Sequence, residues 1–217
     1  MIFEILFCTN QYNYISLSHQ NKKMAGRPKI FDEQEAIQKA TEVFRNKGYD
    51  TASADELLEA MGIGKGSFYL AFKGGKQELY VRSIKQFAEN FNKKIALAIE
   101  NSEDQIEFIR QFFFMLANAE DCDIERGCYL GNALVQLSEK DEDIKKITAE
   151  LLRGLQKIFA KSIKKSQENG QLKTQEDTEI LAWHLTNLWN GIHVTRRMES
   201  SPEILRSMIE MNLKLLE

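Results

Sequence analysis

Basic and hydroxyl side chains gather in one short stretch that lacks acidic residues. From Gly62 to Lys76 the chain has three lysines and no aspartate or glutamate, and Ser67 and Tyr69 stand among them. Ammonium and hydroxyl groups bind phosphate oxygens, and the positive charge acts over about a Debye length, roughly 10 Å. This composition favours contact with a nucleic acid.

Two short helices joined by a tight turn must position these side chains. Ser53 to Glu56 forms a capping box, which opens a helix that ends at Met61-Gly62. After Gly62-Ile63-Gly64 a second helix is predicted from about Lys65 to Phe72. A glycine-containing turn between two short helices is typical of the helix-turn-helix, whose second helix lies in the DNA major groove.

The net charge of the whole chain hides a local asymmetry. The 217 residues carry 29 basic and 32 acidic side chains, a formal net charge of −3. Residues 84–217 alone hold 18 basic and 22 acidic side chains, so this part is net −4. An acidic body therefore masks a basic N-terminal region, and the total charge does not exclude binding to DNA.

Residues 26–83 share an ordered set of positions with a known family. The shared residues are Gly26-Arg27-Pro28, Ala40, Phe44, Gly48-Tyr49, Thr51, Ser53, Gly62-Ile63, Lys65 to Tyr69, Phe72, Lys76 and Glu78-Leu79. In these positions the segment resembles the DNA-binding head of TetR-type transcription regulators. One difference is that the family usually has serine or threonine where this chain has Gly64, so a side-chain cap of the second short helix is missing.

The resemblance and the local chemistry together indicate which residues contact DNA. Arg27 and Lys29 form a basic arm that reaches the minor groove or the backbone, with a solvated basic tail as the alternative. Phe68 and Phe72 are expected in the core. The expected DNA-contacting residues of the head are Ser53, Lys65, Ser67, Tyr69 and Lys76.

The rest of the chain is predicted to be all-α. Two prolines in 217 residues leave few breaks, and long amphipathic segments follow Lys76, without strand alternation. We expect an N-terminal three-helix helix-turn-helix head joined to a larger helical-bundle body. The predicted organisation is an N-terminal extension (1–25), a DNA-binding domain (26–75) and an effector-binding and dimerisation domain (76–217). Helices are predicted over 32–47, 76–100, a segment opened by a capping box at Ser102, 128–138, 141–168, 174–198 and from Pro202 onward.

The N-terminal segment and the cysteines indicate the cellular compartment. Residues 1–23 match nothing in the rest of the chain. We expect either that Met24 is the natural start or that these residues are a loosely held extension, with an extra element packed on the body as the alternative. No apolar run approaches a membrane span, the start is a poor signal peptide, and three cysteines fit neither a disulfide framework nor a zinc pattern. We expect a cytoplasmic protein without a metal or cofactor.

The body offers candidates for binding an apolar small-molecule effector. Aromatic residues supply an apolar lining, and a few polar groups fix the orientation of the ligand. For each of these residues, ordinary packing in the core is the alternative. His184 and His193 are nine residues apart on a predicted helix and share no metal site. The candidate effector-binding residues are Phe112, Met115, Cys128, Asn132, Trp183, His184 and Asn187.

Cys128 has two interpretations. It is either a small core residue or a thiol activated at a helix N-terminus that senses oxidants or electrophiles, with Cys122 as the resolving partner. A helical enzyme and a helical adaptor are the rival classes. Against an enzyme, no motif ties Cys128 to a histidine base; against an adaptor, the lysines from Lys65 to Lys76 form an acid-free run.

The resemblance also implies an assembly and a mechanism. The last two helices, about residues 175–217, are implied to pair with those of a second copy, so that two heads read a palindromic operator in double-stranded DNA. Effector binding would tilt the heads and weaken the fit to DNA. The resemblance implies that the protein represses transcription when it is bound to DNA.

Overall fold

The computed structural model describes residues 31–118, 126–137, 141–199 and 201–217. All regular elements in these ranges are helices, which confirms the predicted all-α class. They are α2 (Glu33–Lys47), α3 (Ala54–Met61), α4 (Lys65–Ala71), α5 (Gly75–Glu100), α6 (Gln105–Leu116), α8 (Tyr129–Leu137), α9 (Glu142–Glu168), α10 (Thr178–Met198), α11 (Pro202–Leu213) and the short 3₁₀ helix η1 (Lys214–Leu216).

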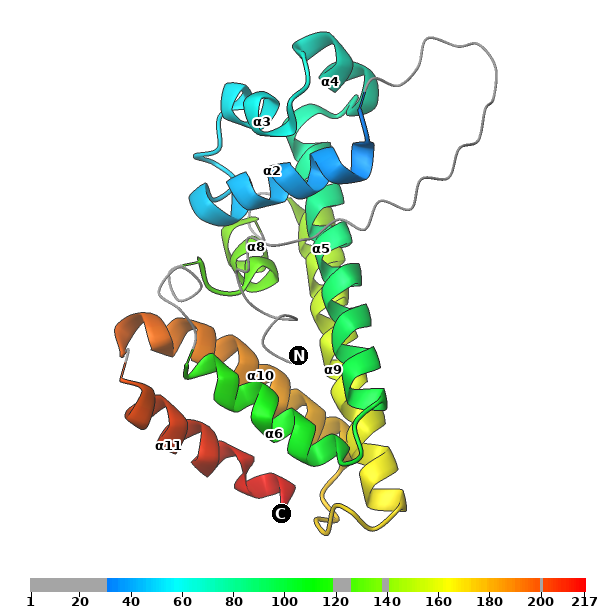
Figure 1. Cartoon of the computed structure of the whole chain (residues 1–217), viewed down its shortest axis with the longest axis vertical. Coiled ribbons are helices and arrows are strands. Elements are labelled where there is room, and N and C mark those ends of the chain that lie inside the picture. Colours follow the sequence, from blue (N-terminus) through cyan, green and yellow to red (C-terminus); the bar gives the residue numbers. More distant parts are fainter. Residues whose placement is uncertain (1–30, 119–125, 138–140, 200) are drawn as a thin grey trace.

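Three helices form a head at one end of the molecule (Figure 1). α2 starts at Asp32, whose carboxylate accepts hydrogen bonds from two backbone N–H groups, and it ends at Gly48, whose φ of 81° favours glycine. The apolar residues of α2 recur every three or four positions and face α3, α4 and the start of α5. Phe44 and Phe72 are among the most buried side chains of this cluster.

Two long helices connect the head to the rest. α5 and α9 lie side by side along the long axis of the molecule, and α8 packs against the upper part of α9 (Figure 1). Ala88 of α5 belongs to the hydrophobic cluster of the head, whereas Ile95, two turns further, belongs to a second cluster. α5 is therefore one continuous helix that contributes to both cores.

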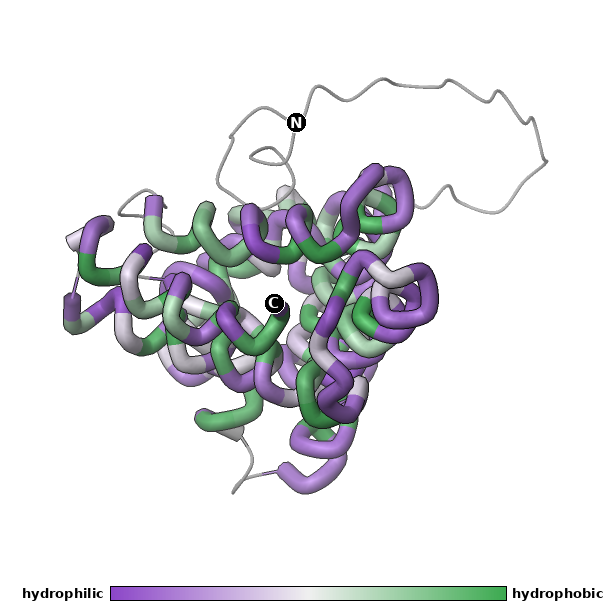
Figure 2. The backbone as a smooth tube through the Cα atoms, turned by 90° about the horizontal axis from the view of Figure 1, so that it is seen from below, coloured by the Kyte–Doolittle hydropathy of each residue, from purple (hydrophilic) through white to green (hydrophobic). Residues whose placement is uncertain are grey.

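The second cluster lies among α6, α9, α10 and α11. Its centre is aromatic: Phe112 stacks on Trp189 with ring centroids 5.3 Å apart, and Phe113 packs on Phe159 at 5.9 Å. The helices around it are amphipathic: hydrophilic and hydrophobic residues alternate along them (Figure 2). Packing of these faces, rather than helix propensity, stabilises the body.

Helix ends were predicted well where one strong cap is present. Asp141 and Ser201 cap α9 and α11 as expected. Two expectations were wrong: α6 is capped by the carboxylate of Asp104 and not by Ser102, and α10 begins at Thr178 after Asp177 rather than at Thr174. In both cases the cap is an aspartate a few residues later, whose carboxylate accepts from backbone N–H groups of the first turn.

Some expectations concern residues outside those described. The N-terminal extension (1–25) and the basic arm with Arg27 and Lys29 lie there, as does most of the acidic stretch 120–127, including Cys122. Among the described helices, none is long and apolar enough to cross a membrane.

Candidate nucleic-acid interface

A tight turn joins α3 to α4. Gly62 ends α3 in the left-handed conformation, with φ 68° and ψ 31°, and its N–H donates to the carbonyls of Leu58 and Glu59. Ile63 donates to Leu58 O at 3.2 Å, which closes the end of the helix. Only a residue without Cβ adopts this φ without strain, so glycine at position 62 sets the angle between the two helices.

α4 has one buried and one open face. Phe68 and Phe72 are buried in the head cluster, as expected. Lys65, Gly66, Tyr69 and Leu70 are exposed, and they repeat at a spacing of four, so that they share one face. Tyr69 is 51% and Leu70 79% exposed, and α4 lies at the outer end of the molecule (Figure 1). This open face of α4 is accessible to a large partner.

The start of α4 lacks a side-chain cap. Gly64 occupies the N-cap position with φ −78° and ψ 157°, and no side chain accepts from the first turn. The first N–H groups of the helix are therefore available to another acceptor, beside the exposed Lys65. Ser67, in the same turn, is half-buried.

Two further predicted contact residues are held by their neighbours. Ser53 accepts from Glu56 N–H at 3.3 Å, and its backbone N–H donates to the Glu56 carboxylate, so the capping box is confirmed. Hydrogen bonds from Lys47 and from Ser53 lower the pKa of Glu56 to about 2. The ammonium of Lys76 donates to Asp50 O at 3.3 Å and lies 4.8 Å from the ring centroid of Tyr49.

Of the candidate effector residues, only Phe112, Met115 and Cys128 pack in or against one hydrophobic cluster. Phe112 is buried in the aromatic stack, and Met115 is partly buried against the same cluster. Trp183 is 46% exposed and Asn187 is exposed, both on α10. His184 Nε2 lies 3.1 Å from Asn212 O and joins α10 to α11.

Cys128 lies at the start of α8, where its sulfur accepts from Gly131 N–H at 3.3 Å. The side chain packs against both hydrophobic clusters. Burial raises the pKa of this thiol, in spite of hydrogen bonds from Gly131 and Trp189 that lower it. Of the two interpretations of Cys128, this arrangement favours the small core residue over the activated thiol, because desolvation outweighs the helix-terminal donors.

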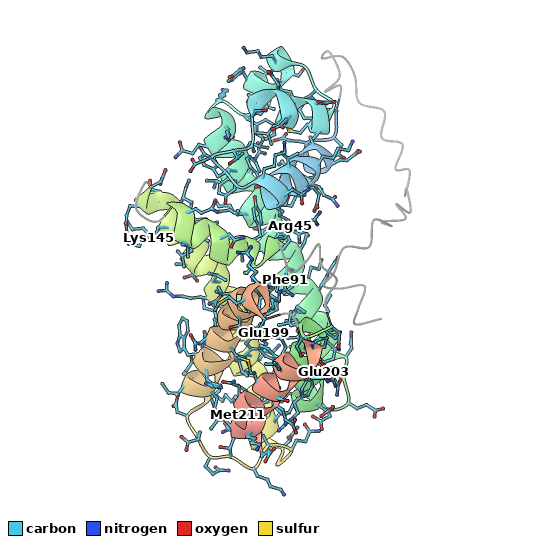
Figure 3. The ribbon with its side chains drawn as sticks, turned by 90° about the vertical axis from the view of Figure 1, so that its left-hand side faces the viewer. Arg45, Phe91, Lys145, Glu199, Glu203 and Met211 are labelled. Carbon is cyan, nitrogen blue, oxygen red and sulfur yellow. The ribbon has the colours of Figure 1, made fainter. Side chains whose placement is uncertain are left out.

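A cavity lies between the head and the body. It has a volume of about 180 Å³, and Asn132 of α8 lines it together with Arg45, Arg126 and Arg197. Figure 3 places Arg45 where the head meets the remainder of the molecule. Sequence reasoning missed this cavity, because its basic residues are about 70 to 80 positions apart in the chain.

A second feature missed from the sequence is a buried polar group below this cavity. His193 of α10 is buried against Trp189, with ring centroids 4.3 Å apart, and no described residue bonds either ring nitrogen. Burial and then the charges of Arg196, Arg197 and Arg45 lower the pKa of His193 well below its usual value. No cluster of three metal-ligating side chains occurs among the described residues.

The fold and the open face of α4 define a helix-turn-helix protein. Comparisons with known proteins extend this to a family. Residues 36–82 match the family described as bacterial regulatory proteins, tetR family, and residues 107–211 match the tetracyclin repressor-like C-terminal domain. Together these two matches span more than half of the chain.

Full-length relatives agree with the two matches. The chain is 26% identical over 195 residues to the uncharacterised HTH-type regulator YezE of Bacillus subtilis, covering 88% of this chain and 100% of YezE. It is 26% identical to the transcriptional repressor ComR of Escherichia coli, over 89% of this chain and 93% of ComR.

Among solved structures, a cysteine mutant of the TetR family regulator CifR, complexed with operator DNA, has the same fold. Its TM-score is 0.75 at 23% identity, covering 88% of this chain and 100% of that one. The chain belongs to the TetR family, and it is a DNA-binding regulator of transcription.

Proposed function

We propose that the protein is a homodimeric repressor that binds a palindromic operator through α4 and is released by a small-molecule effector. The observation that carries the proposal is the open face of α4. It presents Lys65 and Tyr69 from a stretch without acidic residues, at the exposed end of the molecule. A repressor needs no catalytic step, and it acts in the cytoplasm, where a bacterial chromosome lies.

The proposed contacts divide into two kinds. Lys65, Ser67 and Tyr69 reach into the major groove from α4, and the uncapped first turn of α4 donates N–H groups to a phosphate. Ser53 and Lys76, at the starts of α3 and α5, contact phosphates of the DNA backbone. Arg27 and Lys29 complete the interface as a basic arm.

The proposed dimer uses the outer faces of α10 and α11. Many large apolar side chains are exposed on these two helices, and exposed apolar surface favours a partner of the same chemistry. The same surface on a second copy gives a two-fold interface and two heads for a palindrome. The exposed apolar residues of these helices are Ile180 (65%), Trp183 (46%), Val194 (59%), Met198 (84%), Ile204 (48%) and Met211 (67%).

The proposed effector is apolar and enters the body beside the Phe112–Trp189 stack. Phe112, Met115 and Cys128 pack on this cluster, which makes them the candidates that fit a site in the core. Binding there moves α6 relative to α5 and α10. An effector releases the operator only if it binds the released arrangement more tightly than the DNA-bound one.

A gel-shift titration tests the proposal. The full chain is mixed with the DNA that precedes its own gene, at potassium chloride concentrations from 50 to about 300 mM. We expect retardation that weakens steeply as salt rises, because lysine contacts to phosphate release counterions. Absence of salt-sensitive retardation at micromolar protein contradicts the proposal.

A further inference from the structure

The cavity between the head and the body has walls from both. α2 contributes Phe44 to Lys47 and Gly48, α5 contributes Tyr80, and α8 contributes Tyr129, Asn132 and Gln136. Arg126 and Arg197, from the segments before α8 and at the end of α10, complete the lining. A ligand in this space touches the DNA-binding head and the body at once.

The lining is cationic and rich in hydrogen-bond donors. Among the described residues that line it, the charged side chains are those of Arg45, Lys47, Arg126 and Arg197, and none is an aspartate or glutamate. The amide side chains of Asn46, Asn132 and Gln136 add further donors. Guanidinium groups and amides are the donors that bind carboxylate and phosphate oxygens in proteins.

One carboxylate of the protein already pairs with two arginines of the cavity lining. Glu42 of α2 is bonded by two guanidinium groups at once, that of Arg45 at 3.1 Å and that of Arg126 at 3.4 Å. The two arginines come from the head and from the segment before α8. An oxyanion is therefore a bridge that fits the spacing of these two elements.

Arg197 is fixed in its wall by the backbone. Gly127 has φ 62°, and a Cβ at this position would lie 2.7 Å from Nη2 of Arg197, so the guanidinium group lies directly against the turn before α8. The lowered pKa of the nearby His193, with Arg197 and Arg45 among its causes, agrees with a positive potential at this place. Four cationic side chains from three parts of the chain thus line one space, and three of them also pair with a carboxylate: Arg45 and Arg126 with Glu42, and Lys47 with Glu56.

We propose that this cavity is a binding site for a small oxyanion, a phosphate or a short carboxylate, and that its occupancy alters the affinity for the operator. The site is separate from the proposed apolar effector site beside Phe112. Only the second half of the proposal rests on the proposed function, because binding of the anion does not depend on DNA.

The volume limits the class of ligand. Sites for drug-sized molecules usually measure about 300–1,000 Å³, so about 180 Å³ fits a compact anion or the charged end of a larger molecule. The polar lining also disfavours an apolar ligand.

Aromatic contacts connect the cavity to a proposed DNA contact. Phe44 and Tyr80 line the cavity and meet edge-to-face at 4.9 Å, and Tyr80 packs on Tyr49 at 4.8 Å. Tyr49 in turn lies under the ammonium of Lys76. Lys47, on the opposite wall, pairs with Glu56 in the capping box of α3. A change in the cavity is therefore expected to affect Ser53 and Lys76, the two residues proposed to contact the DNA backbone.

Thermal unfolding of the full chain tests the binding half. Potassium phosphate and potassium succinate are compared with potassium chloride at matched ionic strength, which separates the phosphate from the carboxylate source. At about a tenfold excess over its dissociation constant, the preferred oxyanion is expected to raise the midpoint by about 3–6 °C above the chloride value. An equal midpoint in all three salts overturns the proposal.

Two variants of exposed residues remove the site with little risk to folding. Arg197→Gln removes a cation of the wall, and Gln136→Glu places a carboxylate in it without a change of shape. Both are expected to weaken anion binding at least tenfold, while Arg153→Gln, on the exposed side of α9, keeps the full shift. A shift that survives in both site variants overturns the proposal, because the anion then binds elsewhere.

Operator titrations under the same three conditions test the regulatory half. The preferred anion is expected to change the dissociation constant of the wild type at least threefold, and that of Gln136→Glu by less than the error. Anion binding with an unchanged operator affinity overturns the regulatory half alone. Absence of any operator binding, with the thermal shift intact, contradicts the proposed function instead.

Discussion

Gly64 is the residue at which this head differs most clearly from its family. The position has an ordinary φ of −78°, and nothing lies within 4 Å of where a Cβ would be. There is therefore room for a side chain at position 64. Glycine lacks the hydroxyl that would accept a hydrogen bond from the N–H of Ser67.

Gly64→Ser is expected to stabilise the protein and its DNA complex. The added cap contributes about 0.3 kcal/mol, which raises the unfolding midpoint by about 1 °C. The hydroxyl also lies where the first turn of α4 meets the proposed phosphate, so operator affinity is expected to rise about twofold to threefold. Gly64→Ala is the matched control, and an equal gain in that variant would rule out the cap as the cause.

Cys128 is expected to react slowly in the folded protein. Burial raises its thiol pKa, and the thiolate is the reactive form. In a Cys8→Ser/Cys122→Ser variant, alkylation by iodoacetamide at pH 8 is expected to be at least tenfold slower in the native protein than in denaturant. Equal rates would contradict the buried thiol and would restore the oxidant-sensing interpretation.

Residues with short-range partners could be predicted from the sequence. The capping box of Ser53 and Glu56 and the turn at Gly62 depend on neighbours within four or five positions. The effector candidates were harder, because periodicity does not tell a face toward the core from a face toward a second copy. Trp183 and Asn187, both exposed on α10, illustrate this.

At the scale of helices, α3 is attached to α2 through one carboxylate. Glu56 accepts from Ser53 in its own capping box and pairs with Lys47 at the end of α2. Its folded-state pKa of about 2 is below the ordinary value of 4.5, so its stabilising contribution is complete above about pH 4.5. That contribution is lost as the pH falls toward 2.

Glu56→Gln is expected to remove part of the acid sensitivity of the protein. The amide oxygen still accepts from the Ser53 N–H, but it no longer responds to pH. Between pH 5 and pH 3 the unfolding midpoint of the variant is expected to fall less than that of the wild type. Glu59→Gln, on the same helix, is the control, and an identical pH profile for Glu56→Gln and wild type would refute the expectation.

The α10 and α11 pair is the element that makes the dimer in our proposal. Trp183→Glu places a charge on its exposed apolar face, and it is expected to convert the dimer to a monomer at micromolar concentration. Light scattering after size exclusion measures the mass, and operator affinity is expected to fall at least tenfold. Leu97→Glu, an exposed apolar position of α5, should stay dimeric. A dimeric Trp183→Glu with unchanged operator affinity would exclude this interface.

Helix boundaries show how far local signals reach. α2, α9 and α11 each begin at one dominant cap, and their starts were predicted to within a residue. Where two caps compete, as Ser102 and Asp104 do before α6, the choice depends on how the helix packs, which the sequence does not state.

For the whole molecule, the arrangement explains how an acidic protein approaches DNA. The acid-free basic stretch from Gly62 to Lys76 lies in the head at one end of the molecule, whereas the chain as a whole carries a net charge of −3. The cationic cavity lies between the head and α8. Residues as distant as Arg45 and Arg197 meet there, so only the folded chain reveals it.

A footprint on the DNA preceding its own gene tests the central claim most directly. Two protected half-sites are expected, related by a dyad and centred about 34–36 Å apart or a multiple of that. The Lys65→Gln/Tyr69→Phe variant is expected to lose the protection at concentrations that saturate the wild type, while Arg153→Gln keeps it. Symmetric protection that survives in the double variant, or no protection by the wild type, would contradict recognition through α4.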